Sequence, residues 1–184
     1  MIAIRPVRLV DAEALFPLIY QTDVTDTIVW DGPTSLEAYR LTLGEREVEV
    51  ARGERHIFTI LSEAEGQPVG NCSIRPDIAN LRADIGLWIG KPYHGQGYGT
   101  ATVSWLLQYG FGQLGLEKIE ASVFVGNQAS RRIFEKNGFL LEGTIRKAVQ
   151  KRGQAVDEWL FGITRADYEA QGSRARAVSE EGTP

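Results

Sequence analysis

The chain has 184 residues, of which 43% are hydrophobic and 24% are charged, and its formal net charge is −4 at pH 7. This length and apolar content fit one domain with a substantial core. The negative charge argues against a broad nucleic-acid-binding surface, and no apolar stretch approaches membrane-spanning length. Cys72 is the only cysteine, which excludes an intramolecular disulfide and favours a cytoplasmic location. Two histidines and one cysteine supply no ligand cluster, so no metal site is predicted.

The first part of the chain alternates short apolar-patterned segments with turn residues. Asp11 is placed to cap a helix that begins at Ala12, and Pro17 is expected to kink or shorten that helix. Thr34 and Glu37 have capping-box spacing at the start of a second helix. In chain order the pattern predicts a strand at 2–5, the helix from 12, a polar loop at 22–32, a helix from 33 to about 52, a hairpin of strands at 57–61 and 69–74, and a loop at 76–80.

The second part has longer and clearer elements. Gly138 is expected to take the left-handed position after a helix, with Phe139 packing back over the last turn. Residues 172–184 are small, polar and charged, so the domain is expected to span 1–171 and the remainder to form a tail. In chain order the pattern predicts a strand at 82–89, a helix to about 113, a strand at 118–125, a helix from 127 to 137, a closing hairpin of strands at 140–151 and 155–163, and a short helix from 164.

Three glycines at alternate positions lie in the turn His94-Gly95-Gln96-Gly97-Tyr98-Gly99-Thr100, between a predicted strand and a predicted helix. A helix N-terminus carries free N–H groups and a positive dipole end, and glycine lets an anion approach that backbone. A tight turn that needs positive φ would require the same glycines. The nucleotide P-loop and the dinucleotide fingerprint both fit poorly, because the turn lacks a lysine and lies in mid-chain after several strands.

A second motif, Asn127 to Phe139, follows the strand predicted at 118–125. Together the two motifs resemble the GNAT superfamily of acyl-CoA-dependent N-acyltransferases, over about Ile4 to Tyr168. His94 stands where Arg or Gln is usual in that family's loop. Asn127, Ser130 and the stretch from Glu135 to Phe139 are most similar to the ribosomal-protein N-terminal acetyltransferase (RimJ/RimL-like) branch.

The resemblance implies an α/β, single-domain GNAT-like fold with a mixed, mostly antiparallel sheet of about seven strands flanked by helices. Strands 84–89 and 118–125 would run parallel and splay apart, so that the pantetheine of acetyl-CoA enters between them and pairs with exposed backbone. The pyrophosphate would lie on the N–H groups of the glycine turn. The implied coenzyme A contacts are Leu87, Trp88, Ile89, His94, Gly95, Gln96, Gly97, Tyr98, Gly99, Thr100, Asn127, Ser130 and Arg132.

The implied reaction is direct attack of an amine on the thioester, which needs a base, an oxyanion donor and an acid for the thiolate. Many relatives use a tyrosine as the acid, but this chain has Phe134 there, so Ser130 is the candidate. Capping of the helix is the alternative role of Asn127 and Ser130. Asp84 is the candidate base, and a backbone N–H near Trp88 is the oxyanion donor. Glu142, Asp157, Glu158 and a water-mediated route are the alternatives for the base, since residues 148–150 supply no acid.

The acceptor side is less defined by the sequence. Trp30 lies in the segment that borders the acceptor site in this family, although packing beneath the loop would explain it equally well. The predicted function is acetyl transfer to a primary amine, with a protein N-terminal α-amine among the acceptors. Acetylation of a small amine or an antibiotic, and a non-catalytic acyl-CoA-binding module, are the alternatives. Neither nucleic acid nor membrane is an expected partner, and the oligomeric state is left open, with a homodimer among the alternatives.

Overall fold

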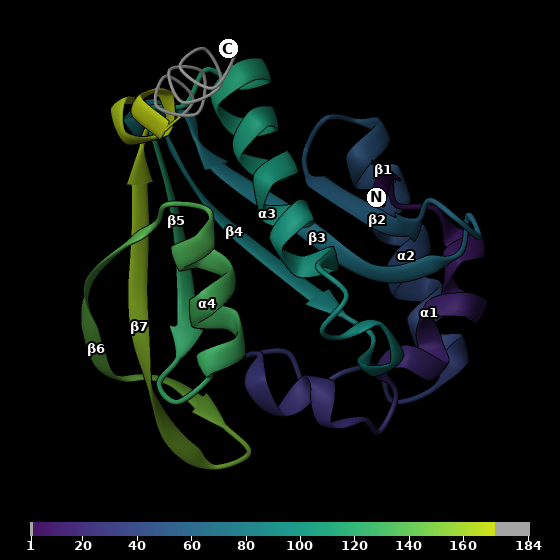
Figure 1. The fold of residues 1–184 in the computed structure, drawn as a ribbon. Helices are drawn as coiled ribbons and strands as arrows, with labels where there is room; N and C mark the ends of the chain where they lie inside the picture. Colours follow the sequence, from purple (N-terminus) through teal and green to yellow (C-terminus); the bar gives the residue numbers. More distant parts are fainter. Residues whose placement is uncertain (1, 172–184) are drawn as a thin grey trace, which may run out of the picture.

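The computed structural model describes residues 2–171, which are arranged around a seven-stranded sheet (Figure 1). Neighbouring strands are antiparallel except β4 and β5, which are parallel. This confirms the mixed, mostly antiparallel sheet. In the order in which they lie side by side, the strands are β1 (Ile2–Pro6), β2 (His56–Ser62), β3 (Pro68–Asp77), β4 (Arg82–Ile89), β5 (Lys118–Phe124), β7 (Gln154–Thr164) and β6 (Leu140–Lys151).

Two pairs of helices cover opposite faces of the sheet. On one face, α3 and α4 bury Leu106 and Phe134 against strand residues such as Ile85, in one core. On the other face, α1 and α2 bury residues such as Leu43 in a second core, against which Trp88 packs. None of the helices within residues 2–171 is long and apolar enough to cross a membrane. The helices are α1 (Ala12–Ile19), α2 (Leu36–Ala51), α3 (Tyr98–Gln108) and α4 (Gln128–Lys136), and the short turns are η1 (Leu9–Asp11), η2 (Asp23–Thr27), η3 (Ile78–Asn80), η4 (Lys91–Tyr93) and the π-helical η5 (Tyr109–Gln113).

The prediction that Asp11 caps α1 is wrong. Its side chain makes no capping hydrogen bond to α1 and instead accepts from the backbone N–H of Arg8 at 3.0 Å. The same carboxylate, almost fully buried, accepts from the guanidinium of Arg5 and, at 2.6 Å, from the hydroxyl of Thr59. These partners hold the pKa of Asp11 below its usual range, against the opposing effect of burial. Asp11 therefore joins η1 to the first two strands.

Two boundaries also differ from prediction. Ser35, rather than Thr34, caps α2, because its hydroxyl accepts from the N–H of Ala38 at 3.1 Å. Strand β3 runs through Pro76, where a loop was expected. Since β2 pairs with β3 only as far as Ile74, β3 is an edge strand beyond that point and needs no donor at the proline.

The ends of two helices follow the predicted chemistry. Gly138 has φ +81°, and the rings of Phe134 and Phe139 lie 5.1 Å apart, so the expected glycine end of α4 is confirmed. The short final helix is confirmed as well, because residues 165–171 are helical and the N–H of Asp167 donates to the hydroxyl of Thr164 at its start. The predicted tail, 172–184, lies outside the described residues.

Candidate functional site

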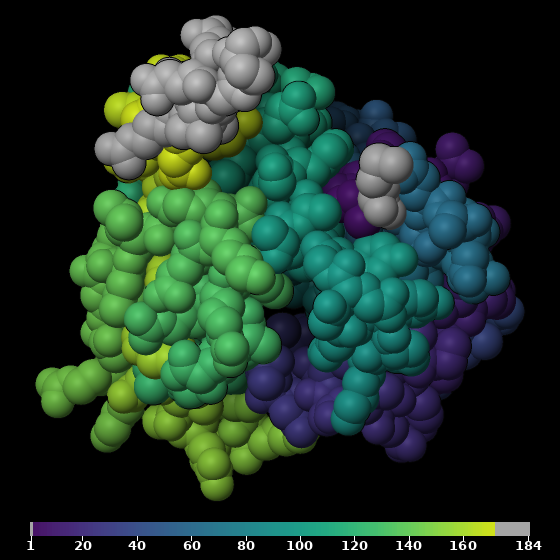
Figure 2. Space-filling model, viewed as in Figure 1, coloured from purple at the N-terminus to yellow at the C-terminus, as the bar shows by residue number. Residues whose placement is uncertain are grey.

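The parallel strands β4 and β5 separate after a short ladder. They pair only over Arg82–Asp84 and Lys118–Glu120. Beyond this ladder β4 pairs only with β3 and β5 only with β7, so within residues 2–171 the facing edges of β4 and β5 have no strand partner. The predicted splay is therefore confirmed. Figure 2 shows the surface hollowed between α4 and the segment that precedes α3, beside this opening.

The glycine turn at the end of β4 uses its glycines for two purposes. Gly95 and Gly97 have φ of +75° and +87°, and a Cβ at either would meet no atom within 4 Å. Gly99 is buried, and a Cβ there would lie 2.6 Å from Cδ1 of Ile133 on α4. The first two glycines thus leave the backbone before α3 open to an approaching group, while the third lets α3 and α4 pack closely.

Three side chains of the turn contact the residues that immediately precede it, at the end of β4 and in η4. The Nε2 atom of His94 lies 2.8 Å from the carbonyl oxygen of Ile89, at the end of β4. The Gln96 amide donates to a backbone carbonyl of η4 at 2.9 Å. The Tyr98 ring lies edge-to-face with Tyr93 at 5.8 Å. These contacts brace the turn, and its free N–H groups remain the part suited to an anion.

At the N-terminus of α4, Asn127 and Ser130 have different roles, which the sequence alone does not distinguish. The side-chain oxygen of Asn127 accepts from the backbone N–H of Ser130 at 3.1 Å, so Asn127 is the cap. The half-buried hydroxyl of Ser130 has no hydrogen-bond partner among the described residues. Phe134 is 3% exposed, and its ring stacks on Phe161 at 6.0 Å. Phe134 thus has a packing role, and the Ser130 hydroxyl is available for another function.

Asn137 joins the two helices that flank the opening. Its amide nitrogen donates to the carbonyl of Thr100 in α3 at 3.2 Å and to that of Ile133 in α4 at 2.9 Å, and the residue is 9% exposed. From the sequence, Asn137 was expected only to end a helix. A polar residue just before the helix-ending Gly138 was the available signal, but its partner on α3 is 37 positions away.

Two side chains predicted to bind ligands lie against the protein itself. The Trp30 ring lies 6.1 Å from that of Tyr39, with the Arg46 guanidinium 5.7 Å from its centroid. Arg132 is exposed and donates from Nε to a carbonyl of its own helix at 3.2 Å. Trp30 therefore packs on α2, which is one of the two interpretations of this residue, and Arg132 lies along α4.

The turn between β6 and β7 is fastened to the loop that contains Trp30. Lys151, only 7% exposed, donates to the carbonyl of Trp30 at 3.1 Å and to the carboxylate of Asp31 at 2.6 Å. Arg152 donates to Asp26 at 2.7 Å. Segments more than 100 positions apart in the sequence are thereby joined near the end of β5 and the start of β7 (Figure 1). No local pattern reveals this contact, because a lysine at the end of a hairpin strand is usually solvated.

Of the four acidic residues considered as a base, three have partners that account for them. Asp84 contacts the guanidinium of Arg75, and Glu142 contacts the Lys118 ammonium at 2.8 Å. Asp157 accepts a backbone N–H of β6 at 2.7 Å. The structure places Asp84 at the closed end of the opening, where the β4–β5 ladder ends.

Glu158, on β7, has a different environment. It is 7% exposed, and no lysine or arginine within residues 2–171 forms an ion pair with it. Burial raises its pKa, and the negative charge of Asp84 raises it further. A hydrogen bond from the Ser122 hydroxyl opposes the increase in pKa without cancelling it.

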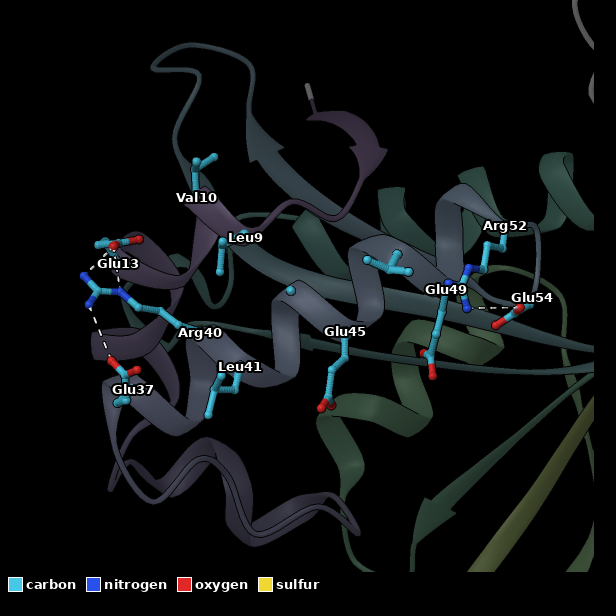
Figure 3. A pocket seen from close by; sticks show the side chains of 12 residues that line it. Leu9, Val10, Glu13, Glu37, Arg40, Leu41, Glu45, Glu49, Arg52 and Glu54 are labelled. Atoms are coloured by element: carbon cyan, nitrogen blue, oxygen red, sulfur yellow. Dashed lines mark hydrogen bonds and ion pairs between the residues drawn. The ribbon is translucent and has the colours of Figure 1, made fainter.

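A separate open groove of about 1160 Å³ lies along α2 and η1 (Figure 3). Exposed apolar side chains line it, and Figure 3 shows Arg40 between the carboxylates of Glu13 and Glu37. The groove contains no residue of either motif and no part of the β4–β5 opening. Arg40 forms ion pairs with two of the glutamates that line the groove. Because no residue of the matched motifs lines it, the chemistry is better assigned to the opening.

Comparison with known proteins gives an independent result. A family model described as acetyltransferase (GNAT) domain matches residues 2–140. The chain is 31% identical to the probable N-acetyltransferase YjcK of Bacillus subtilis (strain 168), over 91% of this chain and 96% of that protein. It is 30% identical to the uncharacterized N-acetyltransferase p20 of Bacillus licheniformis, over 63% of this chain and 66% of that protein. Mycobacterium smegmatis RimJ in complex with CoA-disulfide superimposes with a TM-score of 0.79 and 26% identity, over 90% of this chain and 83% of that one.

Proposed function

The chain belongs to the GNAT family of acetyltransferases, and we propose that it transfers the acetyl group of acetyl-CoA to the α-amine of a polypeptide N-terminus. The observation that carries this proposal is the opening between β4 and β5, which begins after three residue pairs. Both α3 and α4 start where these strands end. One opening therefore presents an unpaired strand edge for an extended ligand, helix-start N–H groups for an anion, and a backbone N–H for a reacting carbonyl.

The opening suits coenzyme A in two physical respects. The unpaired backbone edge at Leu87, Trp88 and Ile89 matches the amides of a pantetheine arm, which would pair with it as an added strand. The unobstructed backbone at Gly95 and Gly97 matches a pyrophosphate. The other proposed contacts are His94, Gln96, Tyr98, Gly99 and Thr100 of the turn and Asn127, Ser130 and Arg132 at α4.

The proposed catalytic groups are those that face the reacting bond. A backbone N–H at Trp88 stabilises the negative charge that develops on the carbonyl oxygen. The Ser130 hydroxyl, which no described residue engages, gives its proton to the leaving sulfur. Asp84, the candidate base of the sequence analysis, lies at the closed end of the opening and is paired with Arg75, so the base is assigned separately below. All of these groups belong to one copy of the chain, so the proposal does not depend on a homodimer.

The acceptor class follows from the resemblance to the RimJ/RimL-like branch and is the finer part of the proposal. We also place the enzyme in the cytoplasm, where a buried free thiol such as Cys72 is stable. A small amine or an antibiotic is the competing acceptor, and a binding module without turnover is the competing function.

The test is a panel of acceptors with acetyl-CoA as donor, read out as released thiol and as acetylated product by mass spectrometry. Peptides with a free N-terminus are expected to react, and the same peptides with a blocked N-terminus are the matched control. Preferential turnover of polyamines or aminoglycosides would overturn the acceptor class. Binding of acetyl-CoA without turnover of any amine would identify a non-catalytic module.

A further inference from the structure

We propose that Glu158 is the base that takes the proton from the acceptor ammonium. This assignment rests on the proposed function and names the residue that makes its attacking amine reactive. The carboxylate lies on β7, a strand that contributes to neither of the two recognisable motifs.

Strand register places Glu158 beside the opening. Glu158 is paired with Phe124, the last residue of β5, in the antiparallel β5–β7 ladder. Its neighbour Trp159 lies beneath the Arg131 guanidinium of α4, so Glu158 points to the opposite face of the sheet. The Ser122 hydroxyl on β5 hydrogen-bonds to it. The strand register places Asp84 of β4, opposite Glu120 of β5, on the same face.

The two faces of the opening therefore have different occupants. The face with α3 and α4 carries the glycine turn and the Ser130 end of α4, which suit coenzyme A. The face with Glu158 is left to the acceptor. Direct attack needs this arrangement, because coenzyme A occupies one side of its thioester and the amine must approach from the other side.

The environment of Glu158 suits a base that accepts a proton from a cationic substrate, the acceptor ammonium. A buried carboxylate normally has a cationic partner, and Glu158 has none among residues 2–171. Ser122 beside it is exposed, so a ligand has access from solvent. An alkylammonium would supply the missing charge. The neighbouring strands carry further charged side chains on this face, and the cations of β3, β4 and β5 all have partners. Arg75 pairs with Asp84, Arg82 with Asp77 and Glu120, and Lys118 with Glu120 and Glu142. On β6, Glu142, Arg146 and Lys147 are exposed.

The proton balance is closed. An N–H bond of the ammonium breaks, its proton moves to the Glu158 carboxylate, and the nitrogen lone pair forms the new N–C bond. The C–S bond breaks, and the sulfur leaves with a proton from Ser130. The second nitrogen proton restores the serine through solvent, and Glu158 releases its proton to water. The net change is ammonium plus thioester giving amide, thiol and one proton.

The experiment compares Glu158→Gln with the wild-type enzyme, using the best acceptor of the panel at saturating acetyl-CoA. We expect turnover at pH 7 to fall about 100-fold with an unchanged Kd for acetyl-CoA. Turnover of the variant should recover as the pH rises and the amine loses its proton in solution, which a merely structural defect would not produce. Glu142→Gln, the same change in a carboxylate already paired with lysine, is the matched control.

Two further variants test the titrating group itself. Ser122→Ala removes a hydrogen bond that lowers the Glu158 pKa, so the acid limb of kcat/KM should move to higher pH. Asp84→Asn removes a charge that raises this pKa, so the limb should move to lower pH. Opposite shifts support the assignment, and an acid limb that neither variant moves overturns it.

The remaining outcomes separate the assignment from the proposed function. Turnover by Glu158→Gln within threefold of wild type at pH 7 would overturn the assignment alone. A wild-type protein that acetylates no amine would overturn both. We also expect Glu158→Gln to melt at a higher temperature than wild type at pH 7. The raised pKa of Glu158 makes its ionised form a cost to the folded state above that pKa, and this cost disappears as the pH falls. A lower melting temperature for Glu158→Gln than for wild type would contradict the view that the Glu158 carboxylate carries an uncompensated charge.

Discussion

The face of the opening with α3 and α4 and the face with Glu158 are built in different ways. The first consists of two continuous segments, each a strand, a turn and a helix start, and most of its polar groups are backbone N–H groups. The second consists of side chains from three strands, with β7 lying next to β5 although it comes two strands later in the chain. A face made of continuous segments leaves a motif in the sequence, whereas a face made of single residues on separate strands does not. The proposed cofactor side is therefore recognisable from sequence and the proposed acceptor side is not.

Gly97→Val should have the largest effect, because loss of cofactor binding would abolish turnover. This variant tests whether the backbone of the first face binds the cofactor. Valine strains a residue at φ +87° and places a branched side chain in the open approach to α3. We expect acetyl-CoA no longer to raise the melting temperature, as measured by calorimetry. Gly53→Val is the matched control, since Gly53 has φ +73°, is equally open and lies between α2 and β2. A normal cofactor response in Gly97→Val would rule out the phosphate-binding turn.

Ser130→Ala should have the next largest effect, with turnover about 100-fold lower at saturating acetyl-CoA. The folding stability should change little, because the cap of α4 uses the Asn127 side chain and the backbone N–H of Ser130, which alanine retains. Rapid-mixing kinetics and thermal unfolding of the same preparation would measure both quantities. Wild-type turnover in this variant would remove Ser130 from the catalytic group.

Asn127→Ala should give a smaller and mixed effect. Loss of the cap should lower the free energy of unfolding by about 1 kcal/mol, and the KM for acetyl-CoA should rise if the amide also holds pantetheine. Asn127→Asp keeps a capping oxygen and serves as the control for stability. An unchanged KM in both variants would restrict Asn127 to a structural role.

Phe134→Tyr should have the smallest effect on turnover, within about threefold of wild type. Phe134 is buried between two other phenylalanine rings, so a new hydroxyl would be enclosed by apolar groups and would lower stability by about 1–3 kcal/mol. Steady-state rates and chemical denaturation would measure the two changes. A large gain in turnover would mean that the site lacks an acid, and would argue against Ser130.

Local signals predicted most elements correctly and failed where a distant partner competed. Asp11 has the right position for a helix cap, but Thr59 and Arg5 engage its carboxylate, and no local pattern reveals partners brought by β2 and β1. Pro76 is a good loop signal, yet β3 continues through it because the pairing with β2 stops at Ile74 and leaves that edge of β3 free. In both cases the local preference was real and tertiary contacts outweighed it.

The family, the order of the elements and the glycine turn could be predicted from local sequence, because each depends on residues that are close together in the chain. The left-handed Gly97 and the start of α4 at Asn127 belong to this class. Three features depend instead on the folded arrangement: Asn137 reaches α3, Lys151 is buried against the loop of Trp30, and Glu158 shares a face with Asp84. Burial and charge are properties of neighbours in space, and only the pairing of β5 with β7 makes Glu158 a buried carboxylate beside the opening.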